Sequence, residues 1–483
     1  DGESSSDDAG DVGDPTDDSA DDDGDGGDGD DGDGTTGGPA GPGDAEIRII
    51  HGAPDAPAVD IYVAGDNEPV VTGLAYGQAS DYLVIPAGTY DFQVRAAGAS
   101  PLDAPVYSTG DLDVPAGASI SALAAGLLDT DGNNAFRVIP LVEGFDDAQP
   151  GQARVRIVHA GSDAPSVDLD VGNDGIDEID DLMRFTETGA GGVALPAGVA
   201  LRLGIRVDGA TVTTFTTPEL PDGGELIVVA TGLLGKLPRE ADGFALLAIG
   251  PEGAIGFVKQ DPTVYALHAG ADAPEVDLCV GNTALATHFG FGEMKSTQVS
   301  PGSYDVDAYA APSGCAGSPA ISDTTPDLVA GERYLVVATG ELAPAMGEPP
   351  LQLEAYRDDL TLGEDDSAVF RLVHAASAPV VDVGIVTGGM IENGNVLAAA
   401  LKWPGESDEL MVQPLTYQIG IASAGQPTPI LPLLDFHVPV EAGQRLFVVA
   451  AGDAFPEGLE AHFRLLAVDT AASPWTVGAI DPN

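Results

Sequence analysis

The stretch IRIIHGAPDAPAVDIYV, from Ile47 to Val63, occurs four times in this 483-residue chain with small changes. The later copies read VRIVHAGSDAPSVDLDV from Val155, VYALHAGADAPEVDLCV from Val264 and FRLVHAASAPVVDVGIV from Phe370. Successive copies of the histidine in this stretch are separated by 108, 109 and 106 residues: His51, His159, His268 and His374. Self-similarity at a fixed period predicts tandem copies of one domain.

Each copy carries strand signals in the same order. The opening strand ends in the histidine, a second strand follows the Pro-rich turn, and later strands include PAGTYDFQVRA from Pro86 and LVAGERYLVVATG from Leu328. Apolar residues alternate with period two between Pro-Gly and Ala-Gly turns, which is typical of antiparallel sandwiches. The predicted fold class is all-β: four tandem immunoglobulin-like antiparallel β-sandwich domains of about six to seven strands each, preceded by a disordered acidic tail.

The domain boundaries are expected where acidic residues and prolines interrupt the strand pattern, as in GFDDAQPGQ from Gly144 and KQDPT from Lys259. The expected units are a disordered Asp/Gly-rich tether at 1–44, repeat 1 at 45–149, repeat 2 at 150–260, repeat 3 at 261–365 and repeat 4 at 366–483. Because short linkers restrict hinge motion, we expect a semi-rigid, elongated rod of single modules.

The chain is strongly acidic, with 18 basic and 78 acidic residues and a net charge of -60. Of the acidic residues, 17 lie in residues 1–44, which contain no Lys or Arg, so the repeats are acidic as well. Such a surface repels nucleic acid and anionic lipid headgroups and attracts cations and basic partners. We therefore expect no nucleic-acid partner, and a high-salt habitat would suit the chain because salt screens its self-repulsion.

The tail and the hydropathy of the chain bear on its location. No run approaches the ~18 consecutive apolar residues of a membrane helix, so we expect no transmembrane segment. The Asp/Gly-rich segment cannot form a core and is predicted to be an extended tether. Tails of this kind commonly join a lipid-anchored cysteine to a folded body in bacterial surface lipoproteins, and a lipid anchor N-terminal to Asp1 is our hypothesis.

The repeated phrase predicts a structural latch. Strand parity places Ile47, Ile49 and His51 on one face, so the histidine lies at the core end of its strand. A buried histidine needs a hydrogen-bond partner, and the turn aspartate or a backbone carbonyl can supply one. The predicted latch residues are, copy by copy, His51, Asp55, Asp60, His159, Asp163, Asp168, His268, Asp272, Asp277, His374 and Asp382.

A metal or ligand site built from the same His and Asp residues is the alternative interpretation, because imidazole and carboxylate are adequate ligands for divalent metals. The fourth copy counts against it, since AASAPVVD lacks the turn aspartate. The stretch DTDGNN has calcium-loop spacing at Asp129, Asp131 and Asn133, but it lacks the Gly at position six and the acidic twelfth residue, which favours a plain turn. We expect no cofactor beyond loosely bound Ca2+.

Both cysteines, Cys279 and Cys315, lie in the third repeat. We expect a disulfide that attaches the loop PSGCAGS to the outer face of the strand VDLCV, with a contribution of about 3 kcal/mol. A disulfide in turn implies an oxidising compartment outside the cytoplasm.

The motif H-x-x-P-D-A-P-x-V-D, followed by P-A-G-x-Y and G-x-x-Y-x-V-V-A-x-G strands, resembles the family called domain of unknown function 4397. The first copy carries the opening motif intact as HGAPDAPAVD, and the third carries the last motif as GERYLVVATG from Gly331. The resemblance covers nearly the whole chain from Ala45. It implies extracytoplasmic β-sandwich modules on bacterial and archaeal surfaces, without an established activity or ligand.

We find no HExxH, GxSxG, Walker or CxxC motif, so we expect no enzyme. We expect an extracellular or cell-surface modular protein that adheres or binds a ligand through the loops where its copies differ. A structural spacer or self-assembling matrix component and a carbohydrate-binding accessory array are the alternatives. The partner is thus an unidentified surface, glycan or protein ligand, or another copy of the chain. Trp403 and Trp475, both in the fourth copy, either serve a specialised contact or fill its core.

Overall fold

The computed structural model describes residues 41, 43–128, 130–344, 346, 348–361, 366–427, 435–455 and 461–483. Residues 1–40 of the predicted tether and Asp129 of the DTDGNN stretch lie outside this part. The described residues form strands, with a single 3-10 turn at Gly132–Asn134 and no α-helix, which confirms the all-β fold class. No described helix is long and apolar enough to cross a membrane.

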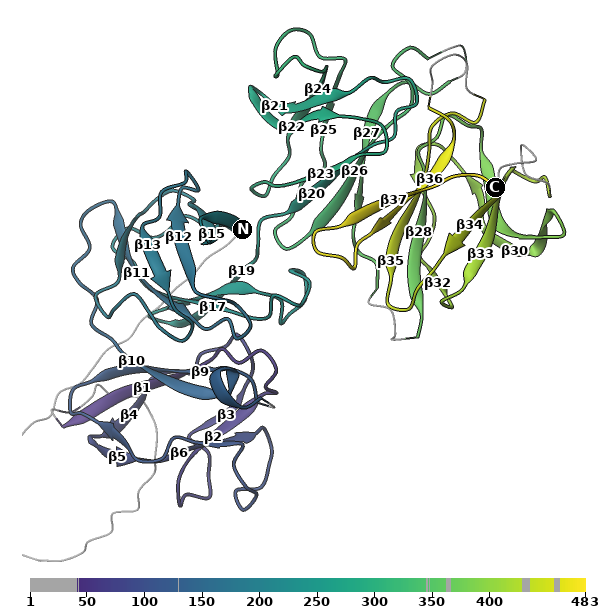
Figure 1. Ribbon diagram of the computed structural model, residues 1–483. Helices are drawn as coiled ribbons and strands as arrows, with labels where there is room; N and C mark the ends of the chain where they lie inside the picture. The colour runs from purple at the N-terminus through teal and green to yellow at the C-terminus, as the bar shows by residue number, and fades with distance from the viewer. Residues whose placement is uncertain are drawn as a thin grey trace, which may run out of the picture.

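Repeat 1 forms two four-stranded sheets and a small β5-β8 ladder (Figure 1). The sheet that contains the opening strand has the order β10-β9-β1-β4 and is called the His sheet. The other sheet, β3-β2-β6-β7, is called the Asp sheet, and it contains the strand that begins with Val59 and Asp60, which we call the VD strand in every repeat. The strands are β1 (Asp44–His51), β2 (Val59–Val63), β3 (Val71–Leu74), β4 (Leu83–Pro86), β5 (Gly88–Tyr90), β6 (Phe92–Ala96), β7 (Tyr107–Ser108), β8 (Leu112–Val114), β9 (Ser119–Ala125) and β10 (Arg137–Val142).

Repeats 2 and 3 have the same two sheets. In repeat 2 the His sheet is β14-β11-β17-β18-β19 and the Asp sheet is β13-β12-β15-β16. These strands are β11 (Gln152–His159), β12 (Val167–Val171), β13 (Ile179–Leu182), β14 (Val193–Pro196), β15 (Arg202–Val207), β16 (Ala210–Thr216), β17 (Glu225–Thr231), β18 (Ala245–Gly250) and β19 (Gly253–Val258). In repeat 3 the two sheets are β23-β20-β26-β27 and β22-β21-β24-β25. Its strands are β20 (Thr263–His268), β21 (Val276–Val280), β22 (Thr283–Phe289), β23 (Met294–Gln298), β24 (Asp305–Ala310), β25 (Ile321–Thr324), β26 (Arg333–Thr339) and β27 (Gln352–Arg357).

Repeat 4 has the His sheet β31-β28-β35-β36-β37, with β32 also paired to β28, and the Asp sheet β30-β29-β33-β34. Its strands are β28 (Ala368–His374), β29 (Val381–Thr387), β30 (Met390–Leu401), β31 (Gly405–Glu406), β32 (Leu410–Val412), β33 (Thr416–Ser423), β34 (Asp435–Pro439), β35 (Arg445–Ala451), β36 (Arg464–Asp469) and β37 (Thr476–Ile480). Each repeat thus has more strands than the six to seven expected, because short segments between the main sequence signals also pair.

One pairing in each repeat departs from the antiparallel pattern. Strand β1 runs antiparallel to β4 but parallel to β9, and the equivalent pairs β11–β17, β20–β26 and β28–β35 are also parallel. A parallel pair needs a long crossover connection, and here nearly the whole repeat lies between the two strands. Hydrophobic alternation indicates which face of a strand is buried but not the direction of its neighbour, so the sequence could not show this pairing.

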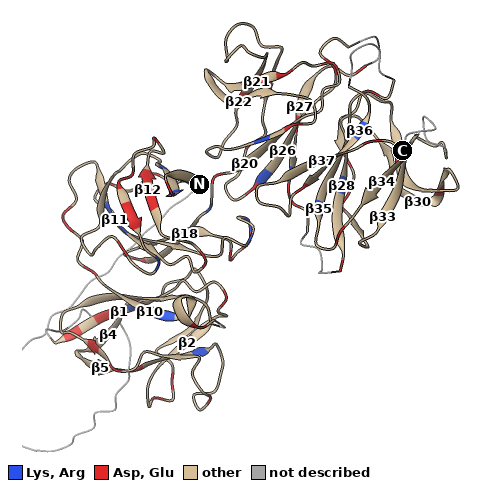
Figure 2. Cartoon of the chain, in the orientation of Figure 1, with Lys and Arg blue, Asp and Glu red and all other residues tan. Residues whose placement is uncertain are grey.

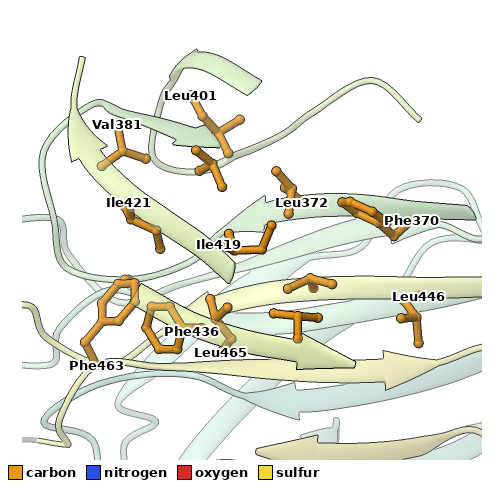
Figure 3. Close-up of a cluster of buried hydrophobic side chains, with 14 of the residues drawn as sticks. Phe370, Leu372, Val381, Leu401, Ile419, Ile421, Phe436, Leu446, Phe463 and Leu465 are labelled. Atoms are coloured by element: carbon orange, nitrogen blue, oxygen red, sulfur yellow. The ribbon is translucent and has the colours of Figure 1, made fainter. Parts of the chain in front are cut away.

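The core of each repeat lies between its two sheets. In repeat 4, Phe370 and Leu372 of β28 meet Ile419 and Ile421 of β33, with Phe436 of β34 fully buried beside them (Figure 3). The same alternation in β1 directs Ile47 and Ile49 into the core of repeat 1. Repeat 3 has the smallest described core, with four buried residues in its cluster: Val276, Leu278, Phe289 and Ala308.

The outer face of the His sheet is buried as well, because repeats pack back to back in pairs. A dry cluster joins repeats 1 and 2 through Ile50 and Leu123 on one side and Val158 and Val229 on the other. A second cluster joins repeats 3 and 4. The residue before each repeated histidine lies in these clusters and is at most 1% exposed: Ile50, Val158, Leu267 and Val373. The chain is therefore built as two pairs (Figure 1), not as the expected rod of single modules.

Polar contacts at the interface of repeats 1 and 2 are reciprocal. The Arg48 Nη1 donates to the carbonyl oxygen of Gly250 in repeat 2, and the Arg156 Nη1 donates to that of Val142 in repeat 1, both at 2.6 Å. Arg48 and Arg156 are equivalent residues in their strands, so the two repeats are related by an approximate twofold axis. Each guanidinium also meets a carboxylate of its own repeat, Glu143 at 3.2 Å and Glu187 at 2.6 Å.

Aromatic contacts replace this pattern between repeats 3 and 4. Tyr265 occupies the position of Arg48 and stacks on Trp475, with ring centroids 4.0 Å apart. The Trp403 Nε1 donates to the Thr339 hydroxyl at 2.9 Å, and that hydroxyl donates to the carbonyl oxygen of Ala375 at 2.7 Å. Both tryptophans therefore serve the contact with repeat 3 rather than filling the core of repeat 4.

Candidate functional site

The repeated histidines are buried, with 1% of each exposed. Their Nε2 atoms lie 3.1, 2.7, 3.1 and 3.1 Å from the carbonyl oxygens of Pro57, Pro165, Pro274 and Pro379. Because a carbonyl only accepts, Nε2 carries the proton in each ring. Burial lowers the pKa of all four histidines, while the proline carbonyl opposes the shift. Each histidine is therefore a neutral group that ties its strand to the following turn.

The turn aspartates hold a different segment. The Asp55 carboxylate accepts a hydrogen bond from the backbone N–H of Leu128 at 2.9 Å, in the loop after β9. Asp163 accepts from Leu234 and Gly235 at 3.0 and 3.2 Å, and Asp272 accepts from Leu342 and Ala343 at 2.6 and 2.9 Å. The sequence left two possible hydrogen-bond partners for the histidine, the turn aspartate and a backbone carbonyl. The structure shows that the carbonyl is the partner, and that the aspartate instead binds the loop that contains Leu128, Leu234 or Leu342.

The aspartate of the VD strand braces both neighbouring strands. Asp60 accepts from the N–H groups of Gly73 and Gly98 at 2.7 and 2.8 Å, and Asp382 accepts from Ala400 and Gly425 at 2.7 Å each. Asp277 follows the same pattern and accepts from His288, Ser313 and Gly314, whereas Asp168 accepts from Asp181 on one side. For Asp277 these backbone bonds, that of Gly314 foremost, lower the pKa of the carboxyl group.

These bonds stabilise a left-handed bulge in the strand beside the VD strand. The donors Asp181, His288 and Ala400 have φ values of 50°, 50° and 51°, and Gly73 has 62°. Side chains other than glycine rarely adopt this conformation, and it persists where the surroundings hold it in place. The carboxylate thus holds a left-handed conformation that recurs in every repeat and compensates backbone strain in the three repeats where the residue is not glycine, which is a structural role.

The fourth copy closes the same turn without an aspartate. The Ser377 N–H donates to the carbonyl oxygen of Gly452 at 3.0 Å, and Ser377 forms an isolated bridge with Asp453. Backbone contacts therefore substitute for the missing carboxylate.

The structure gives the metal interpretation no geometric support among the described residues. No group of three or more His, Cys, Asp or Glu is placed there to hold an ion. In the first copy His51, Asp55 and Asp60 each bind backbone atoms instead of converging on one point. Asp131 precedes the 3-10 turn that contains Asn133, both with exposed side chains, while the third weak calcium candidate, Asp129, falls outside the described residues.

The predicted disulfide between Cys279 and Cys315 is confirmed, with a Cα–Cα distance of 5.8 Å. Cys279 is fully buried because the loop that carries Cys315 covers it on the outer face of β21. The same loop is held by Asp277, which accepts from Ser313 and Gly314. The bond strengthens the repeat whose described core is the smallest.

The largest cavity recorded in the described part is a cleft of about 790 Å³ where repeats 2, 3 and 4 meet, and we call it the junction cleft. Ligand sites typically occupy roughly 300–1,000 Å³, whereas three cavities inside the sandwiches hold only about 20–50 Å³. The side chains with polar or charged groups that line it are Asn173, Arg202, Thr211, Thr213, Thr214, Lys236, Gln260, Thr263, Tyr265, Ser296, Thr297, Gln298, Arg333 and Ser473.

Two arginines of repeat 2, Arg239 and Arg202, join the two pairs at this junction. Arg239 of repeat 2 donates to the carbonyl oxygens of Asp358 and Leu360. The Asp358 carboxylate, with no exposed side-chain surface, pairs with Arg333 at 2.5 Å. Arg202 contacts the carboxylate of Asp261 in the linker at 3.1 Å and the carbonyl oxygen of Gln298 at 2.8 Å. Figure 2 shows Lys and Arg segments of repeats 2 and 3 near this junction, in a chain drawn mostly as other residues.

The junction cleft could not be predicted from the sequence, because its walls come from segments far apart in the chain. One signal was present. The loop from Leu233 to Gly243 carries Lys236 and Arg239, whereas the equivalent loops of the other repeats contain acidic residues and no Lys or Arg. A loop in which Lys236 and Arg239 balance Glu240 and Asp242, in one copy of an acidic repeat, marks the place where that copy differs in its contacts.

The family model described as "Domain of unknown function (DUF4397)" matches residues 45–170 and 262–384, more than half of the chain. The chain therefore belongs to this family. Each match begins with an odd-numbered repeat and ends within the second strand of its even-numbered partner. A search of curated proteins finds no match to the chain.

Proposed function

We propose that this chain is a non-enzymatic, extracellular or cell-surface modular protein that binds its ligand in the junction cleft. Two cavities recorded in the described part have the volume of a ligand site: the junction cleft and one of about 670 Å³ in repeat 4 that is lined by Glu406, Asp408 and Glu409. The observation that carries the proposal is the junction cleft, the larger of the two, whose lining includes Arg and Lys side chains but no carboxylate. Its walls include the loop at Lys236, so recognition would use a segment in which the copies differ.

A binding role fits the repeated residues better than catalysis does. The histidines and aspartates that recur in every copy engage backbone atoms, which leaves them little freedom to act on a substrate. Pairing through the outer faces of the His sheets gives a firm scaffold for the loops between the pairs. Rigid scaffolds that position variable loops are a common arrangement in binding proteins.

The location outside the cytoplasm is supported by the disulfide, since such bonds persist in oxidising compartments. The acidic segment at residues 1–44 would then hold the repeats away from the cell surface. The lipid anchor N-terminal to Asp1 remains our hypothesis, and mass spectrometry of the N-terminus of the native, cell-associated protein tests it. An unmodified Asp1 in that form would contradict anchoring at this end.

The experiment that tests the binding role fills the junction cleft in the full chain. Val212 lines the cleft and has 57% of its surface exposed, so Val212→Trp should block the cavity without disturbing a core. Val106→Trp, at a residue of repeat 1 with 51% exposure outside the cleft, is the matched control. We expect labelled wild-type chain and the control to bind native cell-envelope preparations and V212W to lose that binding. Equal binding by all three would refute the role of the cleft.

A further inference from the structure

The geometry points to an acidic saccharide as the ligand of the junction cleft: an oligosaccharide of sugars that carry carboxylates. This inference rests on the proposed function and specifies its ligand class. Three features of the cleft support this ligand class: its charge, the state of its hydrogen-bonding groups and its exposed apolar surface.

Charge favours an anionic ligand. The chain has 78 acidic residues, yet none is among the described residues that line the cleft, while Arg202, Lys236 and Arg333 are. The partners of the two arginines lie behind the wall, since Asp261 and Asp358 have no exposed side-chain surface, whereas Glu240 and Asp242 beside Lys236 are 17% and 31% exposed but do not line the cleft. Repulsion from the acidic surface would otherwise oppose the approach of an anion, so a cleft without carboxylates is the place where one could be held.

Two of the cations can reach a ligand. Arg202 has 33% of its side chain exposed and uses Nε and Nη2 for Asp261, Thr214 and Gln298. No hydrogen bond from Nη1 to a described residue is recorded, so its two N–H groups can donate to a carboxylate. The Lys236 Nζ lies 3.7 Å from both Glu240 and Asp242, with 44% of its side chain exposed. Charge-assisted hydrogen bonds from such groups are stronger than neutral ones.

Neutral polar groups between the cations suit sugar hydroxyls. Thr213 donates to the Gln260 side-chain oxygen at 2.9 Å and accepts from the Gln298 amide at 3.3 Å, which fixes these groups before any ligand arrives. Hydroxyl and amide groups both donate and accept, as the hydroxyls of a sugar do. Val212 and Leu234, with 57% and 48% exposed, add apolar surface for the C–H face of a sugar ring.

The test is calorimetric titration of the full chain with trigalacturonate, whose methyl ester has the same ring hydroxyls without the charge. We expect the acid to bind and the ester to bind at least about tenfold more weakly, because charge-assisted bonds would be lost. Sodium acetate and sodium sulfate, titrated separately, measure capture of a free anion. If acetate or sulfate bound as tightly as the trisaccharide, the cleft would be a site for small anions, and the proposal of a saccharide ligand would be wrong.

Variants locate the site. Lys236→Glu reverses an exposed charge and should weaken trigalacturonate at least about tenfold. Lys295→Glu makes the same change at a side chain that is 48% exposed and outside the cleft lining, and should leave binding unchanged. Arg202→Gln should also weaken binding, and Arg202→Lys, which keeps the charge beside Asp261, should restore part of it. Unchanged melting curves would show that the variants are folded.

The outcomes separate this inference from the function on which it rests. Equal binding of the acid and its ester, no binding of either, or an unaffected K236E variant would overturn the acidic saccharide. If V212W still abolishes envelope binding in that case, the junction cleft remains the site and only its ligand class is wrong. If V212W has no effect on the envelope and trigalacturonate does not bind, both proposals fail.

Discussion

Each pair of repeats is held together by a buried apolar cluster between its two His sheets, which we call the floor of the pair. The two pairs differ in the polar and aromatic groups around that floor. Between repeats 1 and 2, Arg48 and Arg156 each cross to a carbonyl oxygen of the other repeat. Between repeats 3 and 4, Tyr265 and Trp475 stack instead. The floor supplies most of the association, because burial of apolar surface is non-directional. The surrounding groups differ between the pairs and so favour one pairing of repeats over another.

The largest expected effect comes from placing a charge in one floor. Ile50→Asp should lower the free energy of unfolding of repeats 1 and 2 by on the order of 5 kcal/mol, because it removes a buried side chain and buries an unpaired carboxylate. Val373→Asp should do the same to repeats 3 and 4. Calorimetry of the full chain measures both, and we expect each variant to move the transition of its own pair.

The control is Ile255→Asp, because Ile255 lies in repeat 2 with 68% of its surface exposed. This variant should melt like the wild type. If I50D also melted like the wild type, the repeats would not be stabilised through their outer sheet faces.

A smaller effect is expected from the disulfide, and it should fall on one pair only. Replacing both cysteines, Cys279→Ser with Cys315→Ser, should destabilise repeats 3 and 4 by about 3–4 kcal/mol, as expected when a closed loop of this length is opened. Repeats 1 and 2 contain no cysteine and should be unaffected. Denaturant unfolding, followed by Trp fluorescence, reports repeats 3 and 4 selectively because Trp403 and Trp475 both lie there. An unchanged tryptophan transition in the double variant would contradict this assignment.

The smallest effect is a difference in pH dependence. Burial raises the pKa of Glu341 to about 7, with the charges of Glu348 and Asp453 adding to the shift and a hydrogen bond from Ser377 opposing it. A carboxyl whose pKa is higher in the folded state stabilises that state while it is protonated. Repeats 3 and 4 should therefore lose about 1–3 kcal/mol as the pH rises through 7, a contribution that is complete below the unfolded pKa of about 4.5.

Thermal melts of the full chain between pH 5 and pH 9 measure this loss. Glu341→Gln should remove it from repeats 3 and 4. The buried histidines act in the opposite direction, because their lowered pKa means that stability present above pH 6.5 is lost as the pH falls. That loss should occur in both pairs. A Glu341→Gln variant with the alkaline loss of the wild type would show that this carboxyl is not its source.

The sequence allowed the interior of each repeat to be predicted, but not the contacts between repeats. Strand parity correctly directed Ile47 and Ile49 inward, since one face of a strand must meet the core. The apolar residue at Ile50, on the opposite face, was the signal for a second buried surface, and parity alone does not say what covers it. The junction cleft could not be predicted, because Arg202 and Lys236 of repeat 2 meet Arg333 of repeat 3 only when the repeats are assembled.

The back-to-back packing sets a rule for how such a chain can grow. If a single repeat were added or removed, one His sheet would have an uncovered apolar face, and such an exposed apolar surface promotes aggregation. A cut near residue 260 would leave two halves in which the apolar outer faces of the His sheets still cover one another. A cut near residue 149 or 365 would leave one repeat without its partner. A chain of this architecture should therefore gain or lose repeats two at a time, and the unit of duplication is the pair.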